Sequence, residues 1–405
     1  MTADISAGTT VRLQPLTYVD EGDSVMVGRP DTGSYGVFPA EGADLLRSLE
    51  NGSTLESGAQ RWHEVTGEIL DVDDFLGILT DLGFIVEENG VRVERVQVRW
   101  QRLARALFSP FAWLVYAAVI GIGLTTMVFD PSVRPNYGNI FFTSQLAIIT
   151  VVLALAQFPL LLVHEAFHAL AARRLNLPST LGIGRRFYYL VAETRIDSLY
   201  SVPRAERYLP FLAGALVDAV GVGAFTALSA AGQHWGAPAW LSGLALALAF
   251  SGVMRIAWEC LFYLETDFYF AISTVSGCTD LHAAARHRVR SWIRRALRRP
   301  AKPADGDWSD HDLRAARWYA PLMVGGYGLS AGLLVVVGIP TAVQFWTTAL
   351  HRLDGSQPQT FWGVADTLFF VALSLTELGL LGYVTIRDLR RRRARTSLQT
   401  ERNAS

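Results

Sequence analysis

The sequence predicts a polytopic α-helical membrane protein with a small α+β domain at its N-terminus. Three observations lead to this fold class. The chain has 405 residues of which 51% are hydrophobic, its apolar residues are gathered in blocks, and its acidic and basic residues are separated along the chain. A soluble protein of this size would distribute its apolar residues over amphipathic elements instead.

Residues 1–98 are expected to form a winged-helix-like cytosolic domain. Ser24–Arg29 and Ser34–Phe38 flank a turn sequence, Pro30-Asp31-Thr32-Gly33, and this pattern predicts a hairpin. Amphipathic stretches with helix start and stop signals then predict three helices, at Ala40–Leu49, Leu55–Val65 and Asp73–Leu82.

A second hairpin, formed by Phe84–Glu87 and Val91–Val96 around Asn89-Gly90, is expected to close this domain as a wing. Winged helices commonly bind DNA, but residues 1–98 carry 18 acidic and 6 basic residues, a balance of −12. Because duplex binding needs cationic groups to displace counterions, we expect no nucleic-acid partner.

The N-terminal stretch resembles the leader-binding winged helix of ribosomal-peptide maturation systems, of the pyrroloquinoline quinone chaperone type. The residues that carry the resemblance are Asp31-Thr32-Gly33-Ser34-Tyr35, Glu41-Gly42-Ala43-Asp44-Leu45-Leu46 and Val72-Asp73-Asp74-Phe75-Leu76 with Leu79, Leu82 and Gly83. The resemblance implies that a leader peptide adds as a strand to the sheet edge. The alternative is an acidic cytosolic cap that binds no peptide.

Six apolar segments follow, each long enough to cross roughly 30 Å of hydrocarbon as a helix. They lie at about residues 111–129, 141–172, 208–232, 240–265, 317–340 and 361–386. Arginines are concentrated before the first segment, between the second and third, after the fourth and after the sixth. The positive-inside rule therefore predicts a multi-pass protein of the inner (cytoplasmic) membrane with both termini in the cytoplasm.

These patterns divide the chain into five expected parts. They are the acidic domain (1–98), a membrane core (99–275), a basic cytosolic or interfacial loop (276–316), two C-terminal spans (317–388) and a basic polar tail (389–405). Within the loop, His287–Arg299 is expected to form a helix that lies on the lipid bilayer. Attraction of an acidic peptide is the alternative role of this helix.

The second apolar segment contains an HExxH motif, His164-Glu165-Ala166-Phe167-His168. Two histidines four residues apart lie on one helix face, a spacing that suits two imidazole ligands of one Zn²⁺ ion, with Glu165 beside the open coordination position. Ionisable residues at membrane depth are costly, so they seldom persist there without a partner or a task. The motif therefore predicts a zinc site with Glu165 as its catalytic base.

A catalytic zinc usually has a third protein ligand, and two aspartates are candidates. Asp267 lies where the fourth segment returns to the cytoplasmic side, at the depth of the histidines, and is favoured as the ligand. Asp218, near mid-membrane, is expected to hydrogen-bond a substrate, a water or a histidine, with polar contact between helices as the alternative. The two cysteines, Cys260 and Cys278, suggest neither a disulfide framework nor a cysteine-based zinc site.

Residues 141–270 resemble the site-2-protease-type intramembrane zinc metalloproteases, in particular the peptide zinc metalloprotease branch. The matching motifs are His164–His168, Ala213-Gly214-Ala215-Leu216-Val217-Asp218 and Leu264-Glu265-Thr266-Asp267-Phe268-Tyr269. Ala215 stands where the family usually has proline, and Phe268 where it has glycine. The resemblance implies a zinc near the cytosolic face with Asp267 as a ligand, and with the N-terminal domain it extends to proteases of daptide-type ribosomal-peptide biosynthesis.

Peptide-bond hydrolysis in a small ribosomally made precursor is the expected function. Two alternatives stay open: a signalling protease that cleaves a membrane-anchored regulator, and a non-proteolytic partner for peptide export or immunity with a structural zinc. The oligomeric state is left open.

The connector Leu181–Tyr200 is apolar and aromatic around Phe187, Tyr188 and Tyr189. We expect it to form a strand or hairpin at the site mouth that holds the substrate peptide extended. An interfacial aromatic belt is the alternative.

Overall fold

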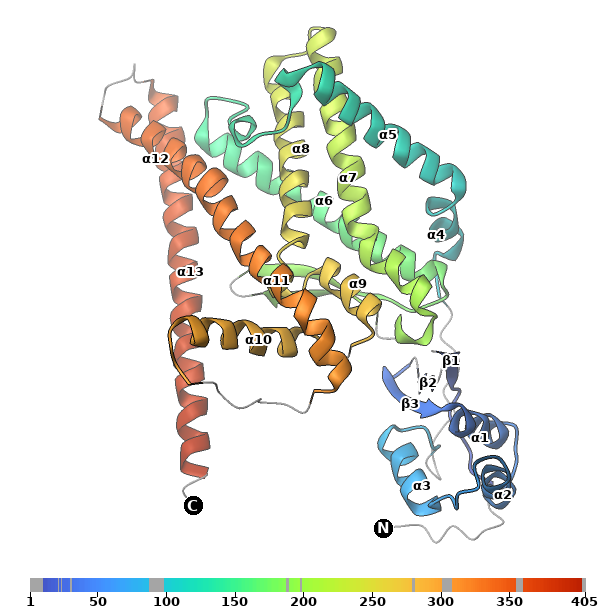
Figure 1. Cartoon of the computed structure of the whole chain (residues 1–405). Helices are drawn as coiled ribbons and strands as arrows, with labels where there is room; N and C mark the ends of the chain where they lie inside the picture. The colour runs from blue at the N-terminus through green and yellow to red at the C-terminus, as the bar shows by residue number, and fades with distance from the viewer. Residues whose placement is uncertain are drawn as a thin grey trace. The chain divides into compact units, whose positions relative to one another are not determined.

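The computed structural model of the chain (Figure 1) describes residues 10–20, 22, 24–29, 31–86, 98–186, 189–196, 199–278, 281–300, 308–354 and 360–402. Two compact units are distinguished, residues 1–109 with 168–181 and 194–211, and residues 110–167 with 182–193 and 212–405. Several of the boundaries fall inside continuous elements, among them the helices α6 (Leu146–Arg174) and α7 (Arg204–His234), which therefore belong to both units.

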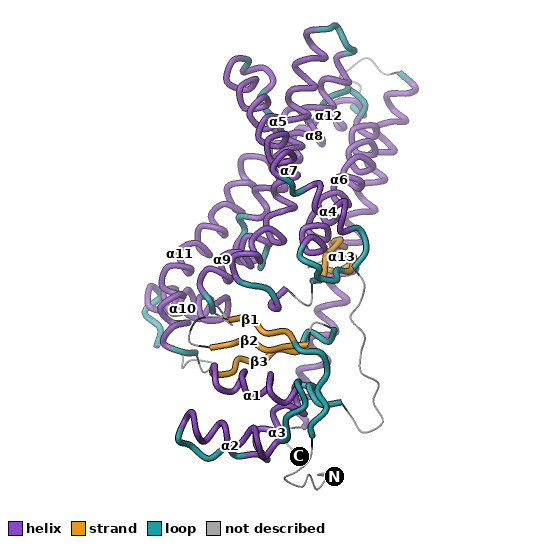
Figure 2. The backbone as a smooth tube through the Cα atoms, turned by 90° about the vertical axis from the view of Figure 1, so that its right-hand side faces the viewer, coloured by secondary structure: helices purple, strands orange, loops and turns teal. Residues whose placement is uncertain are grey.

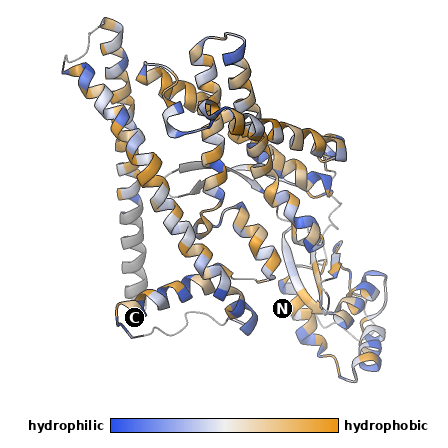
Figure 3. Ribbon diagram, turned by 45° about the horizontal axis from the view of Figure 1, so that its top comes forward, coloured by the Kyte–Doolittle hydropathy of each residue, from blue (hydrophilic) through white to orange (hydrophobic). Residues whose placement is uncertain are grey.

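Six helices among the described residues are long and apolar enough to cross a membrane, which confirms the predicted number of spans. They are α5 (Pro110–Phe129), α6, α7 (Arg204–His234), α8 (Ala239–Glu259), the helical stretch Asp310–Leu353 and α13 (Phe361–Arg402). Figure 3 shows hydrophobic residues along these helices. Their orientation in a bilayer stays a prediction.

The fifth helical stretch is longer than the apolar pattern, which predicted 317–340. It comprises α11 (Asp310–Leu333), a π-helical turn (Leu334–Gly338) and α12 (Ile339–Leu353). The π turn comes shortly before Pro340, which has no N–H for the helical ladder. Polar residues on both sides of the apolar stretch are helical as well, and hydropathy alone does not reveal this.

The N-terminal domain is a three-stranded antiparallel sheet with helices on one face (Figure 2). Its elements are β1 (Thr17–Asp20), β2 (Ser24–Arg29), β3 (Ser34–Pro39), α1 (Ala40–Glu50), α2 (Leu55–Thr66) and α3 (Val72–Asp81). The predicted first hairpin and the three helices are confirmed, whereas β1, which pairs with β2, was not predicted. Most of the predicted second hairpin, residues 87–97, lies outside the described residues.

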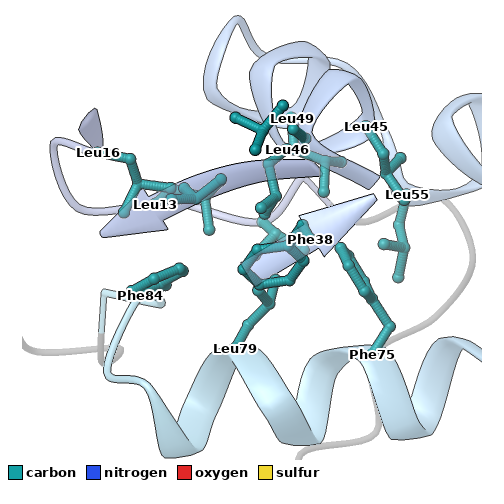
Figure 4. Packing of buried hydrophobic residues seen from close by; sticks show 14 residues of the cluster. Leu13, Leu16, Phe38, Leu45, Leu46, Leu49, Leu55, Phe75, Leu79 and Phe84 are labelled. Atoms are coloured by element: carbon teal, nitrogen blue, oxygen red, sulfur yellow. The ribbon is translucent and has the colours of Figure 1, made fainter. Parts of the chain in front are cut away.

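The core of this domain lies between the sheet and the helices (Figure 4). Alternation along β2 turns Val25 and Val27 to the same face, and the four-residue spacing of Phe75 and Leu79 places both on one side of α3. They enclose Phe38 from β3 together with leucines from α1. This packing fixes α3 beside the sheet.

Shorter elements connect the long helices. They are α4 (Gln101–Leu107) before α5, the strands β4 (Thr180–Arg186) and β5 (Tyr189–Arg195) between α6 and α7, and α9 (Asp267–Ser276) with α10 (Leu281–Ala296) between α8 and α11. α10 contains most of the predicted basic helix, but it begins earlier, at Leu281, because Leu281, Ala285 and Val289 pack in one cluster with residues of α11. Contact of its basic residues with lipid stays a prediction.

The C-terminal helices are tied to α6 by a carboxylate on α13. Asp366 accepts hydrogen bonds from the backbone N–H groups of Leu146 (2.8 Å) and Ala147 (3.0 Å), the first two residues of α6. Arg352 of α12 forms an ion pair with the same carboxylate at 3.1 Å. Because the first N–H groups of a helix have no partner within it, Asp366 acts as a cap supplied by another helix.

Helices α5 and α7 approach each other closely at two glycines. A Cβ atom added to Gly123 would lie 2.4 Å from the Cα of Gly223, and one added to Gly223 would lie 2.6 Å from the backbone oxygen of Val119. Small residues commonly permit such close packing between membrane helices. Gly121, two residues earlier on α5, has nothing within 4 Å of its added Cβ.

We therefore expect Gly123→Ala to destabilise the protein by about 1–3 kcal/mol, because the backbones of α5 and α7 must move apart. Gly121→Ala is the matched control and should change stability by less than about 1 kcal/mol. Thermal unfolding of both variants in the same detergent measures the difference. Equal melting temperatures would show that this approach of α5 and α7 does not exist.

Candidate metal centre

The histidine pair of the HExxH motif is buried on one face of α6. His164, Glu165 and His168 are each at most 8% exposed, although several neighbouring leucine and valine side chains of α6 are exposed. One ligand atom from each of His164, His168 and Asp267 lies within 4.8 Å of the others. The structure thus brings together the two histidines and the aspartate that the sequence predicts as a metal site.

The separation of these atoms fits a single small metal ion. Nε2 of His164 and Oδ2 of Asp267 are 3.7 Å apart. Two ligand atoms on a tetrahedral zinc, with bonds of about 2.0–2.1 Å, stand about 3.3 Å apart. A shift of a few tenths of an ångström would therefore place both atoms in bonding position.

The hydrogen-bond partner of His168 determines which of its nitrogens is free for a metal. Nδ1 of His168 lies 2.6 Å from the backbone carbonyl oxygen of Pro210 on α7. A carbonyl oxygen can only accept, so Nδ1 carries the proton and donates. In the neutral imidazole, Nε2 then has the lone pair that a metal requires.

His164 is oriented in the same way by a carboxylate. Its Nδ1 lies 2.9 Å from Oδ2 of the buried Asp218 on α7. The other oxygen of Asp218, Oδ1, accepts from Nε of Arg255 on α8 at 2.8 Å. Nδ1 of His164 therefore donates to Asp218 and leaves Nε2 to face Asp267.

Arg255 on α8 connects this network to a second residue of α6. Its terminal nitrogen donates to the side-chain oxygen of Gln157, which lies two turns before His164 on α6. Gln157, Arg255, Asp218 and His164 thus form one chain of hydrogen bonds across α6, α8 and α7. Each charged group in it has a partner of opposite charge or a polar acceptor, as burial among apolar helices requires.

Asp267 is positioned by the turn between α8 and α9. It is the first residue of α9, and its backbone N–H donates to the carboxylate of Glu259, the last residue of α8, at 2.9 Å. The hydroxyl of the buried Thr266 donates to the carbonyl oxygen of Glu259 at 2.6 Å. Glu265, which ends the short 3₁₀ turn Phe262–Leu264 before α9, adopts the left-handed region, with φ of 53°.

The arrangement offers two imidazoles and one carboxylate, the ligand types that zinc and similar divalent metals accept. Glu165 is buried next to His164 on the same helix. Such a set leaves a coordination position open for water or a carbonyl oxygen. The roles of these residues as ligands and base stay predictions.

The predicted substrate strand is described only in part. β4 and β5 form a two-stranded sheet in the expected connector, which confirms strand structure there. Phe187 and Tyr188 lie outside the described residues, and Tyr189 begins β5 without a described side chain. The position of the substrate strand at the mouth of the site therefore stays a prediction.

The sequence indicated Asp218 as a hydrogen-bond partner of a histidine, and the structure shows this contact with the first histidine of the HExxH motif. Sequence reasoning missed the other residues that orient the ligands. A signal for Arg255 exists, because it and Glu259 are the only charged residues of α8, and an isolated charge in an apolar helix needs a partner. The carbonyl of Pro210 carries no such signal, because a backbone acceptor can belong to any residue. Gln157 is equally inconspicuous as an uncharged side chain in α6.

No family model, curated protein or solved structure matches the chain. The metal centre is therefore assigned from the geometry of its own residues.

Asp218→Asn is expected to lower zinc affinity by about 10–100-fold, because His164 loses the carboxylate that fixes its orientation and Arg255 loses its counterion. Glu377→Gln is the control, since it neutralises an exposed carboxylate on another apolar helix, α13. Competition with a zinc chelator during equilibrium dialysis measures both affinities. An unchanged zinc affinity in Asp218→Asn would contradict the orienting role of Asp218.

Proposed function

We propose that the protein is an intramembrane zinc metalloendopeptidase of the inner membrane that hydrolyses a peptide bond near the cytosolic face. The observation that carries this proposal is the buried group of His164, His168 and Asp267, with Glu165 in the HExxH motif beside it. This combination is typical of zinc peptidases. The resemblance of the three sequence motifs to site-2-type proteases agrees with it.

We assign a separate role in the reaction to each of these side chains. His164, His168 and Asp267 would hold the metal, which when bound would supply Lewis-acid polarisation of the scissile carbonyl and would lower the pKa of its water. The carboxylate of Glu165 takes the proton of the attacking water and passes one to the nitrogen of the leaving amine. Asp218 and the carbonyl of Pro210 hold the two imidazoles in the tautomer with Nε2 free.

A substrate peptide has to be extended before it can be cleaved, since helical hydrogen bonds hide its carbonyls. The β4–β5 sheet follows α6 directly in the chain and provides strand edges to which such a peptide can add. Phe187, Tyr188 and Tyr189 are the residues we assign to this contact.

We assign the substrate to the class of small ribosomally made precursor peptides, recognised by the N-terminal winged-helix-like domain. Among the described strands, β3 pairs only with β2, so its other edge is a candidate for strand addition. Val37 on β3 and Ile78 on α3 expose apolar surface of the kind that a leader peptide covers. A protease of membrane-anchored regulators does not need this edge.

The proteolytic role is tested with Glu165→Gln. The substitution removes the base while leaving the three assigned ligands in place, so zinc should be retained and cleavage should fall by about 10²–10⁴-fold. A digest of bacterial proteins is incubated with the purified wild type and variant in detergent, and new peptide ends are identified by mass spectrometry. Cleavage that survives Glu165→Gln would place the activity elsewhere. Zinc without any cleavage by the wild type would favour the export or immunity role.

The leader-binding role is tested at the edge of β3. Val37→Arg is expected to slow processing of a precursor peptide from a neighbouring gene by on the order of tenfold, equivalent to about 1.4 kcal/mol, because a charge disturbs the apolar contact. The same peptide without its leader should be unaffected. Val65→Arg on α2 is the control, since Val65 and Val37 are both 64% exposed. Equal rates for both variants would favour a signalling protease.

A further inference from the structure

A second group of metal-binding side chains lies away from the HExxH motif, where α9 ends and α11 begins. Cys278 follows α9, and His311 and Asp312 belong to the first turn of α11. One ligand atom from each of the three lies within 4.8 Å of the others. Helices α9, α10 and α11 lie near one another (Figure 1) and share one apolar cluster.

The distances fit direct coordination of one ion. Sγ of Cys278 and Nδ1 of His311 are 3.5 Å apart. A thiolate sulfur and an imidazole nitrogen on a tetrahedral zinc, with bonds of about 2.3 Å and 2.05 Å, stand about 3.6 Å apart. The observed separation is therefore within about 0.1 Å of that expected for two ligands of the same ion.

The carboxylate of Asp312 is held in place independently of any metal. Its Oδ2 accepts from the backbone N–H of Ser309 at 3.2 Å and from the Ser309 hydroxyl at 2.8 Å, while Ser309 caps α11 in return. This reciprocal capping box fixes the Asp312 side chain at the start of the helix. Oδ1 is the oxygen that we assign to the ion.

The donor set selects the kind of metal. One thiolate, one imidazole and one carboxylate are ligands of zinc and related transition metals, whereas magnesium and calcium prefer oxygen ligands alone. Cys278 and Asp312 are buried, while the imidazole of His311 is exposed, so the ion can enter from one side. Three protein ligands leave a fourth position for water.

The location connects this group to the HExxH site through a short helix. Asp267 is the first residue of α9, and Cys278 follows two residues after its last residue, Ser276. An ion bound by Cys278 and the first turn of α11 would fix the far end of the helix that presents Asp267. We propose that Cys278, His311 and Asp312 bind a second zinc-class ion, which clips α9 to α11 and positions Asp267.

The proposed metal site at Cys278 does not depend on the proposed peptidase function. Only the suggested role of this ion in positioning Asp267 rests on that function. The spacing of the two cysteines in the sequence predicted no such site, because its ligands are 33 residues apart and meet only in the folded chain.

Cobalt substitution tests the proposal, because a thiolate–Co²⁺ bond gives an intense near-ultraviolet charge-transfer band and the HExxH group contains no sulfur ligand. The full-length protein in detergent is depleted of metal and titrated with Co²⁺. We expect the band in the wild type, its loss in Cys278→Ser, and its retention in Cys260→Ser, the control at the other cysteine. The band should also persist in Glu165→Gln and in His164→Ala, which separates this site from the peptidase proposal.

Absence of the band in the wild type, or its survival in Cys278→Ser, would overturn the second site. His311→Ala provides a variant that leaves the core intact, since the side chain is exposed. It should weaken Co²⁺ binding at the thiolate by about 10-fold or more. Zinc analysis of the metal-loaded protein should show a loss of about one equivalent in Cys278→Ser, and an unchanged content would contradict the proposal.

Discussion

The pairing of ionisable side chains inside apolar helices is the constraint on which the rest of this structure depends. Leaving one ion of a buried pair without its partner costs about 3–5 kcal/mol. Asp218 meets this constraint by bonding both His164 and Arg255, and Arg255 in turn bonds Gln157. Since these four residues lie on three helices, their hydrogen bonds also fix α6, α7 and α8 against one another at the depth of the HExxH motif.

The same contacts prepare the site for a metal before one binds. Both histidines have their protons on Nδ1, because Asp218 and the carbonyl of Pro210 accept them there, so both Nε2 atoms are available together. Asp267 is positioned separately, by hydrogen bonds that Asp267 and Thr266 make to Glu259 at the turn between α8 and α9. The two histidines on the long helix α6 thus lie close to the third candidate ligand, Asp267, on the short helix α9.

The sequence predicted those features that are local or periodic. Six apolar helices, the first hairpin and three N-terminal helices follow from hydropathy, turn residues and spacing, and the HExxH motif places two candidate ligands on one helix face. Residues 164, 168 and 267 could be grouped because topology predicts their depth. Arg255 stands out in the sequence as an isolated charge in an apolar helix, but its partners do not. The carbonyl of Pro210, the group at Cys278 and the pairing of β1 likewise depend on tertiary contacts, which no pattern along the chain encodes. The extra helical turns around 317–340 were missed because polar helix ends resemble loops.

X-ray absorption at the zinc K edge measures the ligands of the HExxH site directly, and the Cys278→Ser variant loaded with one equivalent of zinc isolates that site. The account predicts outer-shell scattering from two imidazoles, with nitrogen and oxygen ligands at about 2.0–2.2 Å and no sulfur. Loss of the imidazole signal in His164→Ala would assign it to this motif. A spectrum without imidazole scattering, or one unchanged by His164→Ala, would contradict a metal centre built on α6.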